Sequence, residues 1–221
     1  MNRFVVLLSG GLDSSVNFLA AHSLGEIALA LTFDYGQRAA EKEIEAASRM
    51  CSHFQVRHEV LKLPFFKNLG TSSLIDSSQQ IPTGKQVSID DLKTSQETAK
   101  SVWVPNRNGI FLNIAASYAE SLKAHFIVPG FNREEAATFP DNSEDFLKAA
   151  TGALSYSTSN QVQVRCFTTN LDKSEIVKKG TELGMDWKWI WPCYFSGAKW
   201  CGECESCLRS LRALEKNGIR L

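Results

Sequence analysis

Short apolar runs rich in β-branched residues recur along the chain, and polar segments separate them. The runs cover residues 4–8, 27–33, 56–63, 125–131 and 162–167. Helices are expected between them over residues 13–22, 38–50, 110–122, 143–157 and 173–183. In the second of these helices, Ile44, Ala47 and Cys51 recur at helical spacing with charges opposite. This alternation predicts an α/β fold with an open, mostly parallel five-stranded sheet and helices on both faces.

Two segments depart from this alternation. Residues 64–100 are rich in Ser, Thr, Gln and Lys and lack clear periodicity, so they are expected to form a long excursion, functional or mobile. The α/β domain is expected to span residues 1–185, followed by a small C-terminal segment, 186–221. Trp187, Trp189 and Trp191 alternate at its start, which predicts one face of a strand packing on the domain.

Length and charge narrow the possibilities. At 221 residues the chain is long enough for one sizeable α/β domain with an appendage. Its 24 Lys and Arg balance 24 Asp and Glu, so no global positive field draws it to nucleic acid or a membrane. The apolar run at residues 4–8 is shorter than the core of a secretory signal, and no run is long enough to span a bilayer. The expected location is the cytoplasm.

The stretch "FVVLLSGGLDSSV" at residues 4–16 predicts an anion site. An apolar strand ends at Leu8, Gly10 and Gly11 permit positive φ, and Asp13 and Ser14 stand at a helix N-terminus. Unpaired N–H groups and the helix dipole favour phosphate there. The loop lacks the lysine of a Walker A motif and the third glycine of a dinucleotide fingerprint. An ordinary strand–helix turn capped by Asp13 is the alternative.

Four of the six cysteines crowd the C-terminal segment. Cys193, Cys201, Cys204 and Cys207 have the spacing C-x7-C-x2-C-x2-C, which predicts a closed, structural zinc site in a small helical segment. Buried free cysteines or redox cysteines are the alternative. Arg209 and Arg212 follow on a helix and are expected to solvate its face. Cys51 and Cys166 stand alone.

The loop sequence Ser9–Ser15 resembles the SGGxDSS/T signature of the PP-loop ATP pyrophosphatase superfamily. Further stretches are "FDYGQR" (33–38), "VPNRN" (104–108), "GFN" (130–132), "FPD" (139–141) and "DKSEIV" (172–177). Together with the cysteines, they resemble the 7-cyano-7-deazaguanine synthase family (QueC) over nearly the whole chain. Two departures stand out: Ala39 replaces a common histidine, and residues 133–146 keep only the Pro-Asp pair of the usual segment.

The resemblance implies a PP-loop, HUP-like fold and an ATP-dependent ligase that turns 7-carboxy-7-deazaguanine and ammonia into the 7-cyano compound, a precursor of queuosine. Magnesium accompanies ATP, and Asp13 either holds that ion or caps the helix. Catalytic candidates are Asp13, Arg107 and Lys173. Candidates for ATP binding are Leu8, Ser9, Gly10, Gly11, Leu12, Asp13, Ser14, Ser15, Val16, Asn17, Phe18 and Asp34. Candidates for substrate binding are Tyr35, Asn108, Phe131, Asn132, Phe139 and Asp141.

Ordinary structural roles are the alternative for several of these residues. Lys173 is equally compatible with a solvated lysine at a helix start, and Asp34 with a plain turn role. Arg107 and Asn108 are compatible with helix capping and a surface ion pair.

Competing functions remain open too. They are related chemistry on another acceptor, tRNA sulfur transfer, and a zinc-stapled interaction module without activity. The resemblance implies a homodimer, with small molecules as partners and neither nucleic acid nor a membrane.

Overall fold

The computed structural model describes residues 1–70 and 72–221, and five strands in them form one sheet. The strands are β1 (Asn2–Leu7), β2 (Gly25–Asp34), β3 (His58–Lys62), β4 (Phe126–Val128) and β5 (Gln163–Val164). Their order is β3-β2-β1-β4-β5, and every neighbouring pair is parallel. The predicted five-stranded parallel sheet is therefore confirmed, although β4 and β5 are shorter than their apolar runs.

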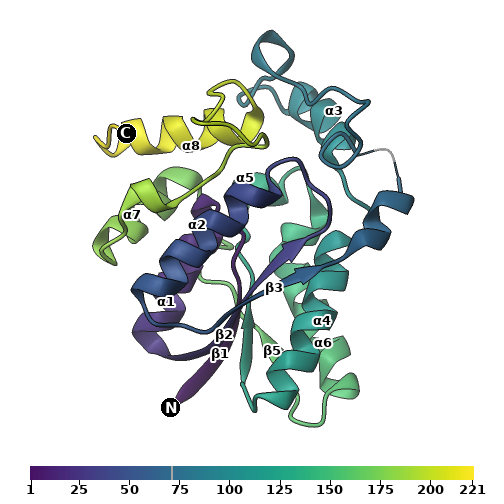
Figure 1. The fold of residues 1–221 in the computed structure, drawn as a ribbon, viewed down its shortest axis with the longest axis vertical. Coiled ribbons are helices and arrows are strands. Elements are labelled where there is room, and N and C mark those ends of the chain that lie inside the picture. Colours follow the sequence, from purple (N-terminus) through teal and green to yellow (C-terminus); the bar gives the residue numbers. More distant parts are fainter. Residues whose placement is uncertain (71) are drawn as a thin grey trace.

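Helices cover both faces of the sheet (Figure 1). They are α1 (Leu12–Leu24), α2 (Ala40–His53), α3 (Leu92–Val102), α4 (Arg107–Ser121), α5 (Arg133–Ala136), α6 (Glu144–Ser157), α7 (Lys173–Glu182) and α8 (Glu205–Lys216). Short 3₁₀ turns lie at Pro64–Asn68, Gly84–Gln86, Pro140–Asn142 and Trp187–Trp189. Helices α1 and α2 lie on one face, whereas α4 and α6 lie on the other.

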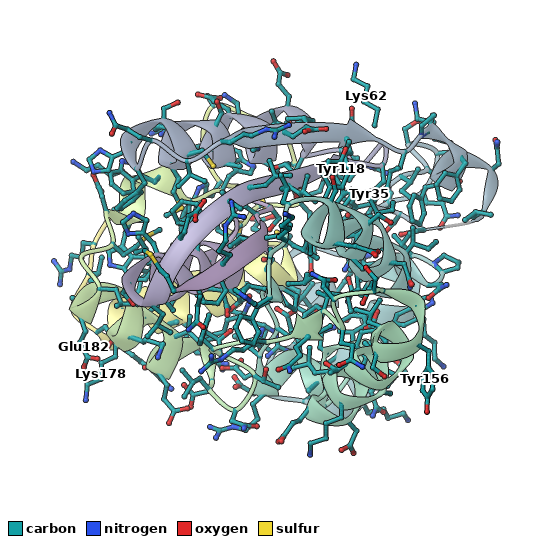
Figure 2. All side chains as sticks on the ribbon, turned by 90° about the horizontal axis from the view of Figure 1, so that it is seen from below. Tyr35, Lys62, Tyr118, Tyr156, Lys178 and Glu182 are labelled. Carbon is teal, nitrogen blue, oxygen red and sulfur yellow. The ribbon has the colours of Figure 1, made fainter. Side chains whose placement is uncertain are left out.

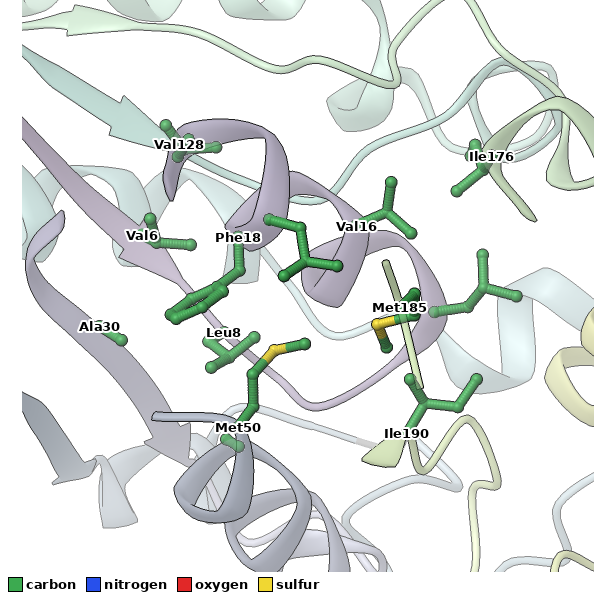
Figure 3. Close-up of a cluster of buried hydrophobic side chains, with 14 of the residues drawn as sticks. Val6, Leu8, Val16, Phe18, Ala30, Met50, Val128, Ile176, Met185 and Ile190 are labelled. Atoms are coloured by element: carbon green, nitrogen blue, oxygen red, sulfur yellow. The ribbon is translucent and has the colours of Figure 1, made fainter. Parts of the chain in front are cut away.

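The first apolar cluster joins the sheet to the C-terminal part of the chain. Phe18 of α1 and Met50 of α2 pack with Val6 of β1, and Ile176 of α7 and Ile190 join the same cluster (Figure 3). Because α1 is enclosed by the sheet and by α7, all residues from Leu12 to Ala21 are buried. This position fixes the start of α1 at Leu12, directly after the glycine-serine loop of residues 9–11.

The excursion is more regular than its composition suggested. Helix α3 forms within it, and the Asp91 side chain caps that helix by accepting from the Thr94 N–H at 2.7 Å. The segment also reaches the C-terminal cysteines, since Thr83 forms an antiparallel bridge with Cys204.

The prediction of a strand at the alternating tryptophans is wrong. Residues Trp187–Trp189 form a 3₁₀ turn, in which Asp186 accepts from the Lys188 N–H at 3.0 Å. Trp187 is buried in the first apolar cluster. Packing against the α/β layers, not pairing with the sheet, therefore explains the tryptophans.

The outer surface carries polar and charged side chains. Lys178 and Glu182 of α7 and Tyr156 of α6 point away from the molecule (Figure 2). None of the helices in the described part of the chain has the length and apolarity needed to cross a membrane.

Candidate active site and metal centre

A cavity of about 250 Å³ opens at the carboxyl ends of the central strands. Leu8 after β1, Phe33 of β2 and Gly130 after β4 line it. The chain leaves β1 toward β2 on one side, while β4 pairs with β1 on the other. Ligands of open α/β sheets bind at such a switch point.

The glycine-serine loop forms the floor of this cavity. Gly10 has φ of 75°, but Gly11 has φ of −76°, so only the first glycine needs the left-handed region. Gly11 is the N-cap of α1 and, having no side chain, supplies no cap to the first-turn N–H groups. Ser14 Oγ instead accepts from the Ser9 N–H at 3.2 Å and lies 3.0 Å from Ser9 Oγ. The uncapped turn, with two hydroxyl groups beside it, suits an anion.

The backbone after β4 approaches this turn very closely. A Cβ atom at Gly130 would lie 2.5 Å from Ser14 N and 2.6 Å from Ser14 Cα. Glycine is therefore required there to keep the loop and β4 together.

Lys173 and two carboxylates form a buried charge cluster at the loop. Lys173 is 3% exposed, and its Nζ donates to Asp13 Oδ2 and lies 2.7 Å from Glu135 Oε1. Burial lowers the pKa of Lys173, but the two carboxylates outweigh it and hold that pKa above its usual value. The alternative of a solvated Lys173 is therefore wrong, and so is the alternative of Asp13 as the helix cap. Burial raises the pKa of Asp13, which Lys173 opposes.

Helix α8 extends this cluster, which corrects the prediction that Arg209 solvates its face. Arg209 is 7% exposed and donates to Glu134 Oε2 at 2.9 Å and to Glu205 Oε1 at 2.8 Å. Glu134 Oε1 in turn accepts from the Lys173 backbone N–H at 2.9 Å. The C-terminal helix is thus bonded to the start of α7.

The opposite wall is built around the start of α4. Arg107 Nη1 donates to Tyr35 Oη at 3.2 Å, and Asn108 Nδ2 donates to the Asp141 carbonyl at 3.4 Å. Asn106, not Asn108, is the N-cap of α4, and Asn108 is 7% exposed. The capping and surface-pair interpretation is therefore wrong, since both side chains line the cavity.

Two further carboxyl groups face the cavity near Arg107. Burial raises the pKa of Glu43 to about 7, opposed by a hydrogen bond from Gln37 Nε2 at 2.8 Å and by Arg107. Burial also raises the pKa of Asp141, again against Arg107. Both groups therefore bind protons more readily than ordinary carboxylates.

The structure brings most, but not all, of the predicted residues to the cavity. Those that line it are Leu8, Ser9, Gly11, Leu12, Asp13, Ser14, Tyr35, Arg107, Asn108, Phe131, Phe139, Asp141 and Lys173. Those outside the lining are Gly10, Ser15, Val16, Asn17, Phe18, Asp34 and Asn132. Among the latter, Asp34 accepts from the Gly36 N–H at 3.1 Å in a turn, and Asn132 caps α5.

Sequence reasoning missed several lining residues. They are Glu43, Glu135, Tyr194, Glu205 and Arg209. Glu135 carried a usable signal, because it follows a predicted strand at the ligand-binding edge of the sheet.

The four C-terminal cysteines form a candidate metal centre. Their sulfur atoms all lie within 4.8 Å of one another, and Cys201 Sγ is 3.9 Å from Cys207 Sγ. The N–H groups of Phe195 and Cys201 donate to Cys193 Sγ at 3.4 and 3.3 Å. Sulfur atoms so close, and stabilised by N–H donors, fit thiolates around one metal ion.

The fold and the two sites define an α/β protein with a candidate anion site at the edge of its parallel sheet and four clustered cysteines that could hold a metal ion. The family model described as "Queuosine biosynthesis protein QueC" matches residues 3–218, so the chain belongs to this family.

Its relatives include a 7-cyano-7-deazaguanine synthase of Bdellovibrio bacteriovorus, 59% identical over 98% of this chain and 94% of that protein. A 7-cyano-7-deazaguanine synthase of Pelotomaculum thermopropionicum is 48% identical over 99% of both chains. An archaeal relative of the same name, from Methanosarcina mazei, is 46% identical over 99% of this chain and 96% of its own length. The similarity thus extends over the cavity and the cysteine centre alike.

Proposed function

We propose that this protein is a 7-cyano-7-deazaguanine synthase. In this reaction ATP and ammonia convert the carboxylate of 7-carboxy-7-deazaguanine into a nitrile. The observation that carries the proposal is identity of up to 59% to synthases of that name over almost the whole chain. The altered segment 133–146 does not weaken it, because Asp141 and Glu135 from this segment still line the cavity.

The chemistry requires activation of a poor leaving group. The substrate carboxylate attacks a phosphorus atom of ATP, and pyrophosphate leaves in the adenylyl-transfer variant that the loop favours. Ammonia then displaces the activated oxygen to give an amide. A second ATP activates the amide oxygen, whose loss leaves the nitrile. The first-turn N–H groups of α1 and the hydroxyls of Ser9 and Ser14 would hold the phosphates.

Recognition of the flat base is assigned to the wall near α4. Asp141 offers carboxylate oxygens to the N–H edge of a guanine-like ring, while Phe131 and Phe139 offer apolar faces. Tyr35 and Asn108 complete this wall. Arg107 supplies a fixed positive charge for the substrate carboxylate.

Two metal ions are part of the proposal. Cys193, Cys201, Cys204 and Cys207 would hold Zn²⁺, because a tetrahedron with Zn–S of about 2.3 Å places sulfur atoms about 3.8 Å apart. Asp13 would contribute to a Mg²⁺ site on the phosphates, since its buried Oδ1 has no hydrogen-bond partner in the described protein. Zinc stabilises the segment, and Mg²⁺ neutralises phosphate charge.

The remaining expectations stay proposals as well. We place the protein in the cytoplasm as a homodimer that takes small molecules and no nucleic acid. Transfer of sulfur to tRNA is less favoured, because Cys51 is buried and burial raises its pKa to about 12. Such a thiol is a poor nucleophile.

Mass spectrometry of a reaction with 7-carboxy-7-deazaguanine, ammonium and Mg-ATP tests the function. The wild-type protein should produce first the amide and then the nitrile. Asp13→Asn should abolish both products, whereas Glu182→Gln on the outer face of α7 should keep wild-type activity. ATP consumption with another acid but not with this one would move the protein to a different acceptor. A salt-sensitive gel shift with tRNA would favour the sulfur-transfer alternative.

A further inference from the structure

The cavity has more negative than positive side chains. Five carboxylic residues line it: Asp13, Glu43, Glu135, Asp141 and Glu205. Three cationic residues line it: Arg107, Lys173 and Arg209. A site for an anionic nucleotide gains nothing from an excess of carboxylates, so some of them serve cations or protons.

Most of these carboxylates already have partners. Lys173 holds Asp13 and Glu135, and Arg209 holds Glu205 at 2.8 Å. Asp141 belongs to the proposed base-recognition wall. Glu43 is left without an ion pair among the described residues.

Glu43 has a neutral hydrogen-bond donor and a mixed charge environment. Gln37 Nε2 donates to its Oε2 at 2.8 Å, and Gln37 itself is fixed by donating to the Phe33 carbonyl at 3.0 Å. Arg107 from α4 lowers the pKa of Glu43, and Asp34 from β2 raises it. No hydrogen bond from the described residues reaches its other carboxyl oxygen, and Glu43 lines the cavity.

The position of Glu43 is fixed relative to the glycine-serine loop. A Cβ atom at Gly10 would lie 2.8 Å from the Glu43 carbonyl oxygen and 2.8 Å from Ala46 Cβ. The first turns of α2 therefore pack directly against the loop. Glu43, the loop residue Ser9 and Ser14 of α1 line the same cavity, so an acyl group activated on the loop would share that cavity with the Glu43 side chain.

We propose that Glu43 binds the incoming ammonium and accepts the protons that nitrogen loses during the reaction. This role rests on the proposed function. Ammonium transfers one proton to the carboxylate, and the resulting ammonia attacks the activated carbon. The C–N bond forms, the C–O bond to the phosphate breaks, and the amide nitrogen loses a further proton. In the second activation the nitrogen gives up both remaining protons as the activated oxygen leaves and the C≡N bond forms. Because a carboxylate holds one proton at a time, Glu43 passes each proton to water in the cavity before it accepts the next. A carboxyl group that burial has made more basic accepts these protons near neutral pH.

Comparison of two nucleophiles tests this role at neutral pH. Ammonia is almost entirely protonated there, whereas hydroxylamine is largely neutral and needs no base to release its electron pair. Glu43→Gln should lower kcat/KM for ammonium by about 100-fold, a typical contribution of a general base. Hydroxamate formation with hydroxylamine should fall much less, because hydroxylamine does not need the initial deprotonation. Glu45→Gln, an exposed substitution on the same helix, is the control and should change neither rate.

The outcomes separate the two proposals. Equal losses with both nucleophiles, or no loss with ammonium, would overturn the role of Glu43. Wild-type protein that forms neither nitrile nor hydroxamate would overturn the proposed function and, with it, this role. Circular dichroism checks the fold of Glu43→Gln. If that variant is unfolded, Glu43→Asp replaces it, and its shortened acid should again impair ammonium use selectively.

Discussion

Replacement of Glu43 by glutamine should stabilise the unliganded protein at alkaline pH and leave its stability unchanged at acid pH. In the folded protein the pKa of this carboxyl is about 7, raised from an ordinary 4.5, chiefly by burial. A raised pKa means that the folded state binds the proton more tightly than the unfolded state. The associated stability is therefore present below pH 4.5 and is lost as the pH rises through 7. Glutamine does not titrate, so the variant keeps this stability as the pH rises.

The size of the effect follows from the shift. A difference of 2.5 pKa units corresponds to about 3.4 kcal/mol at about 1.4 kcal/mol per unit, which is an upper bound. Because Glu43 is only half-buried by surface area and borders the cavity, solvent screening reduces this to roughly 1–2 kcal/mol. The gain should be close to zero at pH 4.5 and complete at pH 8.

Urea unfolding of wild-type, Glu43→Gln and Glu45→Gln proteins at pH 4.5 and pH 8 measures the effect. Glu45→Gln removes an exposed pair with Lys42 and Arg49 and should change the unfolding free energy little at either pH. A Glu43→Gln protein less stable than wild type at pH 8, or equally shifted at both pH values, would refute the reasoning.

Four other substitutions test separate parts of the structure. Gly130→Ala should push the backbone of Ser14 away, lowering ATP affinity in calorimetry and stability by about 1–3 kcal/mol. Gly152→Ala has open space at its Cβ position in α6 and should stabilise by about 0.5–1 kcal/mol instead. Cys204→Ser should reduce the zinc content found by atomic absorption and lower the melting temperature; an unchanged value of both would reject the metal centre. Arg209→Met leaves the buried Glu205 carboxylate without its ion pair and should cost about 3–5 kcal/mol in urea unfolding.

The glycine-serine loop was predictable because all the residues that form it are neighbours in the sequence. Within residues 8–15 a strand ends, Gly10 turns the backbone and a helix begins, so local rules suffice. The cysteine spacing is local in the same way, and the four sulfur atoms do gather within 4.8 Å. The alternation of apolar runs likewise predicted the sheet.

Contacts between distant segments were not predictable from the sequence. Lys173 meets Asp13 across 160 positions, and Arg209 meets Glu134 across 75. Lysine and arginine side chains on helices are usually exposed to water, so it was reasonable to expect that Lys173 and Arg209 are solvated. Helix α3 escaped notice because its buried face consists of the small residues Ser95, Ala99 and Val102, a weak signal in a polar sequence. Only the folded arrangement shows which charges are enclosed.

The strand order has a consequence for the growing chain on the ribosome. β1 emerges first, yet in the sheet it lies between β2 and β4, and β4 is residues Phe126–Val128. A nascent chain that has paired β1, β2 and β3 therefore keeps one edge of its central strand open until β4 arrives. That open edge lies beside the first turn of α1. Lys173, which pairs with Asp13 of this turn, and Arg209, which pairs with Glu134, are synthesised later still. The candidate anion site is therefore complete only after α7 and α8 have been synthesised, long after the loop on which they pack.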